Sequence, residues 1–341
     1  MASTEPTTPL VNITIGTPGD DALPGGTGLD EIHGLAGDDV LSGGAGDDLL
    51  YGGAGNDTIT DGVGYDTIDG GSGIDTYYRN FSLDYSDYLF VVNIDLEKGT
   101  ITSADFPDAV PDYIQNIENV TGEGSFHYII TGDSNNNYLL TDVGDDILNG
   151  GAGDDVLNGG AGDDSLDGGS GTDTAHYNGQ PSNFTLGKGG NSYTLADTLG
   201  NEGEDTLVNI ERLHFSNGAD IAIDTGVGEI GGSCYRIYKA AFNRTPDKGG
   251  LGYWIGQMDL GKTLVEVSAG FIDSDEFRAS YGTNPTNGEF LTKVYNNVLG
   301  RDPDSGGYDW WVDQLANNPE KSWNKVMADF SEGTEKQANV L

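Results

Sequence analysis

Basic residues and cysteine are scarce in this chain of 341 residues. Lysine and arginine total 15 against 56 aspartates and glutamates, which gives a formal net charge of -41. A surface this acidic repels nucleic acid and anionic membranes, so we expect neither as a partner. Cys234 is the single cysteine. The chain therefore has no intramolecular disulfide framework, and we expect Cys234 to be a small buried residue on a helix.

Histidine is scarce as well, and the four histidines form none of the motifs that support catalysis. No H-E-x-x-H sequence occurs, and no histidine fits a serine or cysteine nucleophile pattern. Without a cluster of cysteine and histidine, a zinc site is disfavoured too. We therefore expect no catalytic residues and a protein that is not an enzyme. The histidines are His33, His127, His176 and His214.

Long apolar segments are also missing. No run approaches the roughly 20 residues that a membrane-spanning helix needs, so we expect no transmembrane segment. The start, MASTEPTTPLVN, has neither a basic region nor an apolar region, so we expect no cleavable secretory leader.

Glycine and aspartate, by contrast, are abundant and periodic. Residues 16–78 consist of nine-residue blocks with the pattern G-G-x-G-x-D-x-U-x, where U is apolar, as in GGAGDDLLY. Residues 132–176 return to this pattern, as in GGAGDDVLN. The sixth position of successive blocks holds Asp21, Asp30, Asp39, Asp48, Asp57, Asp66 and Asp75, and then Asn137, Asp146, Asp155, Asp164 and Asp173.

This nonapeptide resembles the RTX, or hemolysin-type, calcium-binding repeat. The resemblance implies a parallel β-roll, a form of β-solenoid, in which two blocks complete one turn. The apolar eighth positions would then face inward as a narrow core. It also implies an extracellular or cell-surface protein that leaves a Gram-negative bacterium by type I secretion.

The stacked carboxylates predict calcium as the cofactor. Carboxylates at strand spacing, about 4.8 Å, repel one another without a cation between them. Calcium takes six to eight oxygen ligands, which two stacked loops can share, whereas magnesium prefers compact octahedra. Each loop would stack on the loop two blocks later, so that Asp30 pairs with Asp48 and Asp146 with Asp164. We expect about eight calcium ions, one fewer if Asn137 cannot serve. The acids at position five should point outward.

The remaining segments complete a mainly β plus α architecture: two parallel β-roll blocks with β-strand flanks, followed by a small all-α domain. The runs IQNIENV and LVNIERL, in corresponding places after the two rolls, indicate that the roll and its flank are duplicated. The flanks should continue or cap the solenoid. The predicted segments are a tail with an N-terminal strand at 1–15, the first roll at 16–78, a flank at 79–131, the second roll at 132–176, a cap at 177–230 and the helical domain at 231–341.

The helical domain has an internal duplication of its own. Tyr238, Arg244, Asp247 and Trp254 lie 57 residues before Tyr295, Arg301, Asp304 and Trp311. The segment from about Ser233 to Leu341 resembles a helical domain of unknown function that is often appended to RTX surface proteins. We expect each arginine to bridge the acidic turn between two helices. A contact with a partner or a glycan is the alternative, and its candidate residues are Trp254, Trp310, Arg244 and Arg301.

Together these patterns predict a secreted calcium-binding structural protein in cell-surface adhesion, a matrix or an S-layer-like assembly. Its partners would be calcium, further copies of itself, a cell-surface polysaccharide or a surface protein. The alternative is an accessory or binding module of a secreted enzyme system, such as one that acts on polysaccharides. RTX rolls also follow enzymes of that kind, so the repeats alone leave this alternative open.

Overall fold

The computed structural model describes residues 10–79, 91–103, 110–226 and 228–333. The chain divides into two units, residues 1–221 and 222–341, so the division lies ahead of the position that the change in composition predicts. Residues 1–9 of the predicted N-terminal tail lie outside the described residues.

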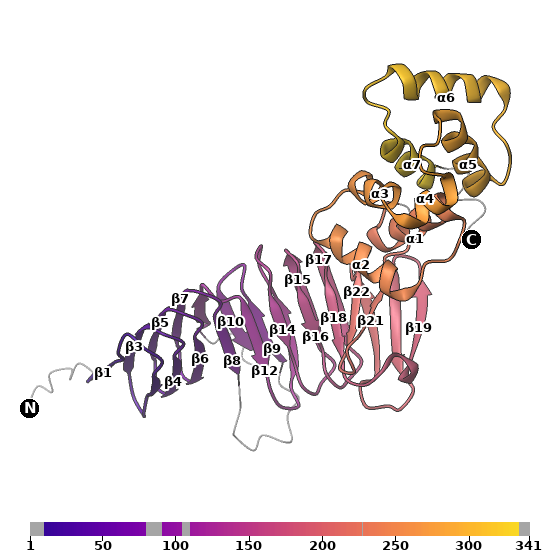
Figure 1. The fold of residues 1–341 in the computed structure, drawn as a ribbon. Coiled ribbons are helices and arrows are strands. Elements are labelled where there is room, and N and C mark those ends of the chain that lie inside the picture. The colour runs from indigo at the N-terminus through magenta and orange to yellow at the C-terminus, as the bar shows by residue number, and fades with distance from the viewer. Residues whose placement is uncertain (1–9, 80–90, 104–109, 227, 334–341) are drawn as a thin grey trace, which may run out of the picture. The chain divides into compact units, whose positions relative to one another are not determined.

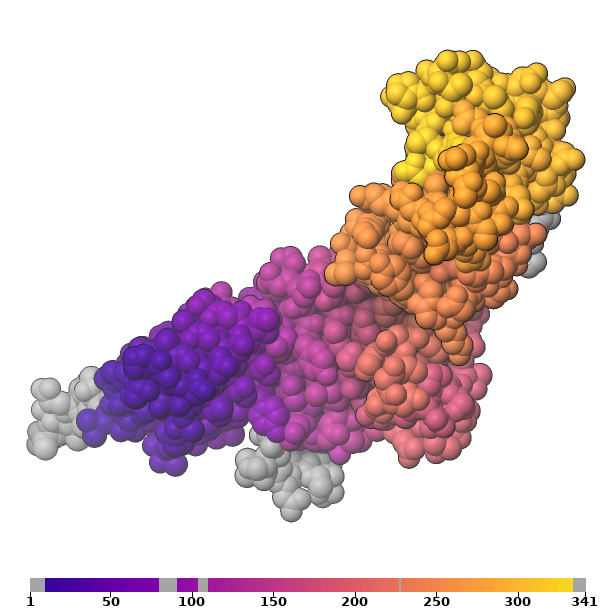
Figure 2. Space-filling view, in the orientation of Figure 1, coloured from indigo at the N-terminus to yellow at the C-terminus, as the bar shows by residue number. Residues whose placement is uncertain are grey.

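The first unit is a parallel β-solenoid (Figure 1). Along each roll, successive strands alternate between two sheets, so that the chain coils. Within the described residues one sheet has thirteen strands, in the order β1-β3-β5-β7-β11-β10-β9-β13-β15-β17-β21-β20-β19. The other has ten, in the order β2-β4-β6-β8-β12-β14-β16-β18-β22-β23. In the space-filling view the turns, coloured from indigo to magenta, lie against one another as contiguous layers (Figure 2).

The strand bounds follow the repeat. The strands up to the first flank are β1 (Asn12–Ile15), β2 (Ala22–Pro24), β3 (Asp30–Ala36), β4 (Val40–Ala45), β5 (Leu49–Ala54), β6 (Thr58–Val63), β7 (Thr67–Ser72), β8 (Thr76–Arg79), β9 (Val91–Asp95), β10 (Thr100–Ser103), β11 (Asp112–Gln115) and β12 (Asn119–Gly122). Those that follow are β13 (His127–Thr131), β14 (Tyr138–Leu140), β15 (Ile147–Ala152), β16 (Val156–Asn158), β17 (Ser165–Ser170), β18 (Thr174–Tyr177), β19 (Phe184–Gly189), β20 (Ser192–Asp197), β21 (Glu204–Val208), β22 (Arg212–Phe215) and β23 (Ala219–Ala222).

The register confirms the predicted coil of two blocks per turn. Within the rolls each residue lies beside the residue 18 positions later, as Glu31 does beside Leu49 and Val40 beside Thr58. This register stacks equivalent repeat positions on one another. The eighth positions therefore form the core, and from Ile32 to Ile68 and from Leu139 to Leu166 they are 0% exposed.

The two rolls share continuous sheets. In the ten-stranded sheet β12 joins β8 of the first roll directly to β14 of the second. The other sheet is extended there by β9, β10 and β11, where β10 runs antiparallel to both neighbours. The run IQNIENV is divided between β11 and β12. Asn116, at a φ of 52°, turns the chain from one sheet to the other.

Close stacking explains why the repeat needs glycine. At Gly64, where φ is 150°, an added Cβ would collide with the carbonyl oxygen of Gly46 in the preceding turn. Leu35 breaks this rule: it has a φ of 82° at a position that is glycine in the blocks stacked above it, Gly53 and Gly71. An L-residue held in this region is strained. The Leu35 side chain is 47% exposed and so gains little from burial.

The second unit is helical, with α1 (Ile230–Phe242), α2 (Lys248–Asp259), α3 (Leu264–Ile272), α4 (Asp275–Tyr281), α5 (Asn287–Leu299), α6 (Ser305–Asn317) and α7 (Trp323–Ser331). The side chains of Thr263 and Ser274 cap α3 and α4. Helix α2 begins after Asp247, whose carboxylate accepts a hydrogen bond from the Gly250 N–H and caps it. Cys234 is buried on α1, as expected.

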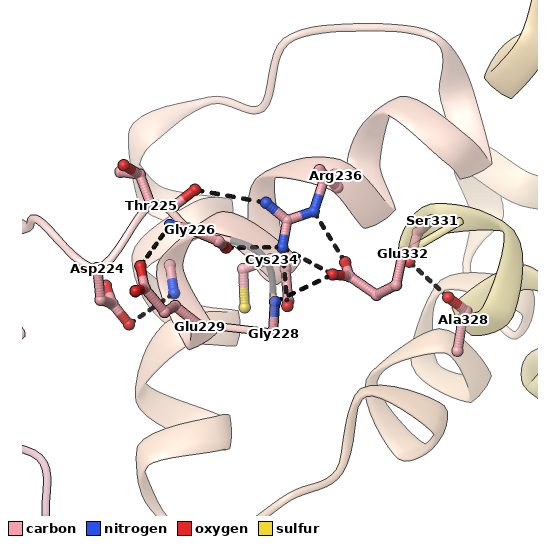
Figure 3. A network of polar contacts seen from close by, with 12 residues as sticks. Asp224, Thr225, Gly226, Gly228, Glu229, Cys234, Arg236, Ala328, Ser331 and Glu332 are labelled. Carbon is pink, nitrogen blue, oxygen red and sulfur yellow. Dashed lines mark hydrogen bonds and ion pairs between the residues drawn. The ribbon is translucent and has the colours of Figure 1, made fainter. Parts of the chain in front are cut away.

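A buried ion pair fixes the segment before α1 within this unit (Figure 3). Arg236 is 6% exposed, and its Nη2 lies 2.7 Å from a carboxylate oxygen of Glu332, just after α7. The same nitrogen donates to the Gly226 carbonyl oxygen, and the Gly231 N–H donates to Asp224. The two ends of the helical unit are thereby joined. No helix among the described residues is long and apolar enough to cross a membrane.

Replacing Leu35 by glycine should stabilise the first unit by about 1 kcal/mol, because glycine adopts positive φ without strain. Thermal unfolding at saturating calcium measures the change. Gly53→Leu at the stacked position is the matched opposite substitution. It should destabilise, since a Cβ there would meet the Leu35 carbonyl oxygen. A lower melting temperature for Leu35→Gly contradicts the assignment of strain.

Candidate metal sites

The position-six aspartates lie at the ends of the solenoid loops, where the strands begin. From Asp30 onward they are nearly inaccessible to solvent despite their charge: Asp39, Asp57 and Asp155 are each 1% exposed, and Asp75 and Asp173 are 0% exposed. Burial of an ionised carboxylate is costly unless it is paired or bound to a cation. What these oxygens contact therefore decides what the loops can bind.

From Asp39 onward, one oxygen of each carboxylate accepts a hydrogen bond in a ladder along the solenoid. The backbone N–H of Asp30 donates to Oδ1 of Asp48 at 2.8 Å, and that of Asp57 donates to Oδ1 of Asp75 at 2.7 Å. The second roll repeats this geometry, with Asp146 donating to Asp164 at 2.8 Å. Each loop thus stacks on the loop two blocks later, with the partners that the sequence predicts.

The second oxygen of most of these carboxylates has no hydrogen-bond partner. Nine buried Oδ2 atoms share this property, and they belong to Asp39, Asp48, Asp57, Asp66, Asp75, Asp146, Asp155, Asp164 and Asp173. Asp21 and Asp30, in the first loops, differ. Their Oδ2 atoms accept from the backbone N–H groups of Thr17 and Gly26 in their own loops. The later loops leave the equivalent oxygen available to a ligand.

Backbone carbonyl oxygens face the same space. At Gly34 an added Cβ would lie within 3.0 Å of both Asp39 Oδ2 and the carbonyl oxygen of Gly52 in the next turn. Gly150 has the same surroundings, with Asp155 Oδ2 and the Gly168 carbonyl oxygen. Glycine therefore leaves room between a carboxylate and a carbonyl of two stacked turns. Oxygen donors of this kind fit calcium.

Few side chains would contribute to any one site. Among the described residues, no group of three or more histidine, cysteine, aspartate or glutamate side chains is placed to hold a metal ion. A bound cation would therefore depend on one or two carboxylates together with backbone carbonyls. Calcium accepts such a set because its coordination is large and flexible.

Burial raises the pKa of several ladder carboxyls, above all Asp66, Asp164 and Asp173. Desolvation is the largest cause for Asp66, Asp164 and Asp173, and repulsion from the stacked acids adds to it. The pKa rises from 3.8 to about 7 for Asp66, about 8 for Asp164 and about 7 for Asp173. The metal-free loops therefore hold their negative charges at a cost that a cation relieves.

One step of the ladder carries its own positive charge. Asp61 replaces the first glycine of its block, and it is 2% exposed. The Tyr77 hydroxyl donates to Asp61 at 2.6 Å, and the guanidinium of Arg79 forms an ion pair with the same carboxylate. Arg79 also lies 3.9 Å from Asp112. This guanidinium partly neutralises the acids around Asp66.

Sequence reasoning missed four carboxylates that continue the ladder beyond the repeats. Asp66 and Asp164 donate their N–H groups to Asp112 and Asp205, and Asp75 and Asp173 donate theirs to Glu118 and Glu211. Residues 200–208, GNEGEDTLV, form a degenerate repeat block that stacks on the block at 159–167. The signal was present: the duplicated flank reads D-Y-I-Q-N-I-E from Asp112 and D-T-L-V-N-I-E from Asp205.

At the start of the second roll, two positions of the carboxylate ladder are occupied by residues that are not acids. Asn137 occupies a position-six site and donates from Nδ2 to the Glu118 carbonyl oxygen at 2.8 Å. Its Oδ1 accepts from the Asp133 N–H, so the amide is satisfied by the protein. Tyr128 takes the equivalent place below Asp146. These contacts fit a structural role for Asn137, in which its side chain serves the protein and not a metal ion.

The position-five acids form a second hydrogen-bond ladder, in which the N–H of the later turn donates to the carboxylate of the earlier turn. The Asn56 N–H donates to Asp38 at 2.7 Å, and the Thr172 N–H donates to Asp154 at 2.8 Å. These carboxylates are exposed, as the sequence predicts, but they also tie each turn to the next.

In the helical unit the candidate contact residues are placed differently from one another. Arg244 makes a bidentate ion pair with Glu276 and lies 3.7 Å from Asp247, and Arg301 lies 3.9 Å from Asp304. Trp254 packs against Phe271, and its ring fills the space beside Gly270. Trp310 is 52% exposed. The arginines thus lie at the acidic turns, and Trp310 offers a ring face to solvent.

Comparison with protein families agrees with these two units. Residues 15–50, 42–77 and 140–175 match the family described as RTX calcium-binding nonapeptide repeat (4 copies). Residues 234–280 and 268–340 match the family described as Domain of unknown function (DUF4214). No curated protein matches the chain. The chain therefore carries RTX repeats followed by a DUF4214 region, and the four additional ladder carboxylates lie outside both sets of matches.

Without metal, the first unit should lose stability as the pH rises. A carboxyl whose pKa is raised in the folded state contributes its full stabilisation of the fold at a pH below its unfolded pKa, which is near 4. This contribution is lost as the pH rises through the pKa of the folded state. For Asp66, Asp164 and Asp173 that window extends to about pH 7 or 8. The strand signal of metal-free protein in circular dichroism, followed from pH 4 to pH 8, measures the effect.

The control for this pH series is a matched pair of substitutions. Asp164→Asn should flatten the pH dependence. Asp163→Asn, which changes the exposed neighbour, should leave the pH dependence as it is. Saturating calcium should reverse the slope, because ligands bind metal in the deprotonated form. A metal-free strand signal that increases from pH 5 to pH 8 contradicts the buried-carboxylate explanation.

Proposed function

We propose that this chain of RTX repeats and a helical domain is a secreted structural protein whose solenoid folds when it binds calcium outside the cell. The observation that carries the proposal is the set of nine buried Oδ2 atoms without a hydrogen-bond partner. A solvated acidic surface would leave these oxygens in water. A permanently folded metal-free solenoid would pair them with protein donors.

The residues explain how folding and binding are coupled. Calcium supplies positive charge and accepts carboxylate and carbonyl oxygens as ligands. The position-six carboxylates and the position-one carbonyls are brought together only when two turns stack, so the unfolded chain has no preformed site. Binding free energy then becomes folding free energy. At low calcium the repulsion of the acids keeps the chain open, which suits export in an unfolded state.

We infer that the protein acts without catalysis. The histidine rings pack against side chains of neighbouring strands. The ring centroids of His33 and Tyr51 lie 4.8 Å apart, and those of His176 and His214 lie 4.7 Å apart. His127 contacts the backbone of Asp145. These contacts support a structural use of each histidine. A scaffold for a surface or matrix needs only the solenoid and a region that contacts partners.

The first strand supports self-association as the form of assembly. In the described residues β1 is the last strand at one end of the thirteen-stranded sheet, so one of its edges has no strand beside it. Ile13 and Ile15 on this strand are 62% and 63% exposed. An apolar edge of this kind is a template for pairing with another chain. We propose that calcium-folded copies associate through it.

The folding proposal is tested by circular dichroism and tryptophan fluorescence during a calcium titration. All four tryptophans lie in the helical unit, so their emission reports that unit while the strand signal reports the solenoid. Calcium should increase the strand signal and change the emission little. Asp57→Ala and Asp155→Ala should raise the calcium concentration needed, and exposed Glu97→Gln is the control. Strand structure at full strength in chelator would sink the proposal.

The assembly proposal is tested by light scattering over the same titration. Particle mass should increase with calcium for the unmodified protein. Ile13→Lys should keep the particle monomeric, because a charge at the edge opposes pairing, while circular dichroism shows the same folding. Leu260→Lys, at a residue 84% exposed in the helical unit, is the matched control. A monomer at every calcium concentration rules out association through this edge.

A further inference from the structure

The two N-I-E segments are turns of the same design at the end of each roll. Asn116-Ile-Glu118 connects β11 to β12, and Asn209-Ile-Glu211 connects β21 to β22. Each stacks on the last repeat loop before it, which ends in Asp75 or Asp173. The register places Gln115 beside Asp69, so Asn116 follows where the repeat has the glycine of position one. The turn therefore replaces a six-residue loop with three residues.

The asparagine of each turn supplies a fixed carbonyl oxygen. Asn116 and Asn209 have φ values of 52° and 49°, the left-handed conformation that asparagine tolerates. Their Nδ2 atoms donate to Asp69 and Asp167 at 2.8 Å. Held in this way, their carbonyl oxygens lie within 3.0 Å of the points where a Cβ would stand on Gly70 and Gly168. In the repeats the position-one carbonyl of the next turn, such as that of Gly52, occupies this place.

The glutamate of each turn takes the place of the repeat aspartate. Oε2 of Glu118 accepts from the Asp75 N–H at 2.8 Å, and Oε2 of Glu211 accepts from the Asp173 N–H at 2.8 Å. The extra methylene of glutamate lets the carboxylate reach the ladder from a shorter turn. A carboxylate and a carbonyl thus face the last repeat loop, as in the stacked repeats.

The last repeat loop supplies the remaining oxygen. Asp75 and Asp173 are both 0% exposed, and the Oδ2 atom of each has no hydrogen-bond partner. Asp75 Oδ2 lies 2.7 Å from the same point at Gly70 that the Asn116 carbonyl approaches. An unpartnered carboxylate oxygen and a carbonyl therefore meet beside Gly70, and the Glu118 carboxylate lies at the backbone N–H of the same Asp75.

We propose that each N-I-E turn completes an additional calcium site, one with Asp75, Glu118 and the Asn116 carbonyl, and one with Asp173, Glu211 and the Asn209 carbonyl. This inference rests on the proposed function, because it requires that the solenoid bind calcium. It places metal ligands outside the repeat matches, in segments that would otherwise serve as caps. It also makes each flank part of the calcium-dependent fold.

The test counts the calcium ions bound at saturation, by equilibrium dialysis with calcium alone, in wild type, Glu118→Gln, Glu211→Gln and the double variant. Glutamine keeps a carbonyl acceptor for the ladder N–H, so the fold is retained and circular dichroism confirms it. Each single variant should lose one ion and the double variant two. Glu97→Gln should lose none.

A second variant separates the roles within the turn. Asn116→Gly keeps the left-handed conformation and the carbonyl oxygen, so it should keep the ion count. If Glu118→Gln fails to fold at all, Glu211→Gln at the other roll still decides the question. Equal counts in wild type and the double variant overturn the additional sites and leave the repeat sites standing. A wild type that binds no calcium overturns the proposed function itself.

Discussion

The solenoid depends on how its buried carboxylates are neutralised. From Asp39 to Asp173, each position-six aspartate uses one oxygen to receive an N–H from the turn before it, and this contact fixes the spacing of the turns. The other oxygen is left facing the protein interior without a donor. Hydrophobic burial alone cannot offset the cost of these buried charges, because the core between the two sheets is narrow. Each sheet contributes one row of apolar side chains, such as Leu41 and Ile59 in one of them. A cation between the turns resolves the conflict.

Glycine and the carboxylates are two parts of one constraint. Turns that stack closely enough for the ladder leave no space for side chains at positions such as Gly46 and Gly64. The same closeness brings carbonyl oxygens up to the carboxylates. Where the chain departs from the repeat, it substitutes another charge arrangement: the Arg79 guanidinium pairs with Asp61, and the Asn137 amide replaces an acid. The departures therefore show the same need for balanced charge as the repeats do.

The helical unit follows different physics. Its core is made of large apolar side chains, among them Phe271, Phe290 and Met327, and its helices are closed by conventional caps. The Arg236 ion pair joins its first helix to the segment after its last. Such a unit needs no cation to bury its core. Under the proposed function, the calcium response therefore belongs to the solenoid, while the helices keep a calcium-independent fold.

The sequence by itself determined the local features of this protein. A period of nine with glycine, aspartate and an apolar residue at set positions dictates the strand, the loop and the buried face, and Asp30 opposite Asp48 follows from two blocks per turn. The helix caps at Thr263 and Ser274 are equally local. Only the tertiary structure decided what depends on chain paths through the flanks. Asp66 meets Asp112 across 46 residues and Asp173 meets Glu211 across 38, so no repeat count predicts these contacts. The unpartnered Oδ2 atoms were likewise invisible in the sequence, because whether a buried oxygen has a donor is set by every element packed around it.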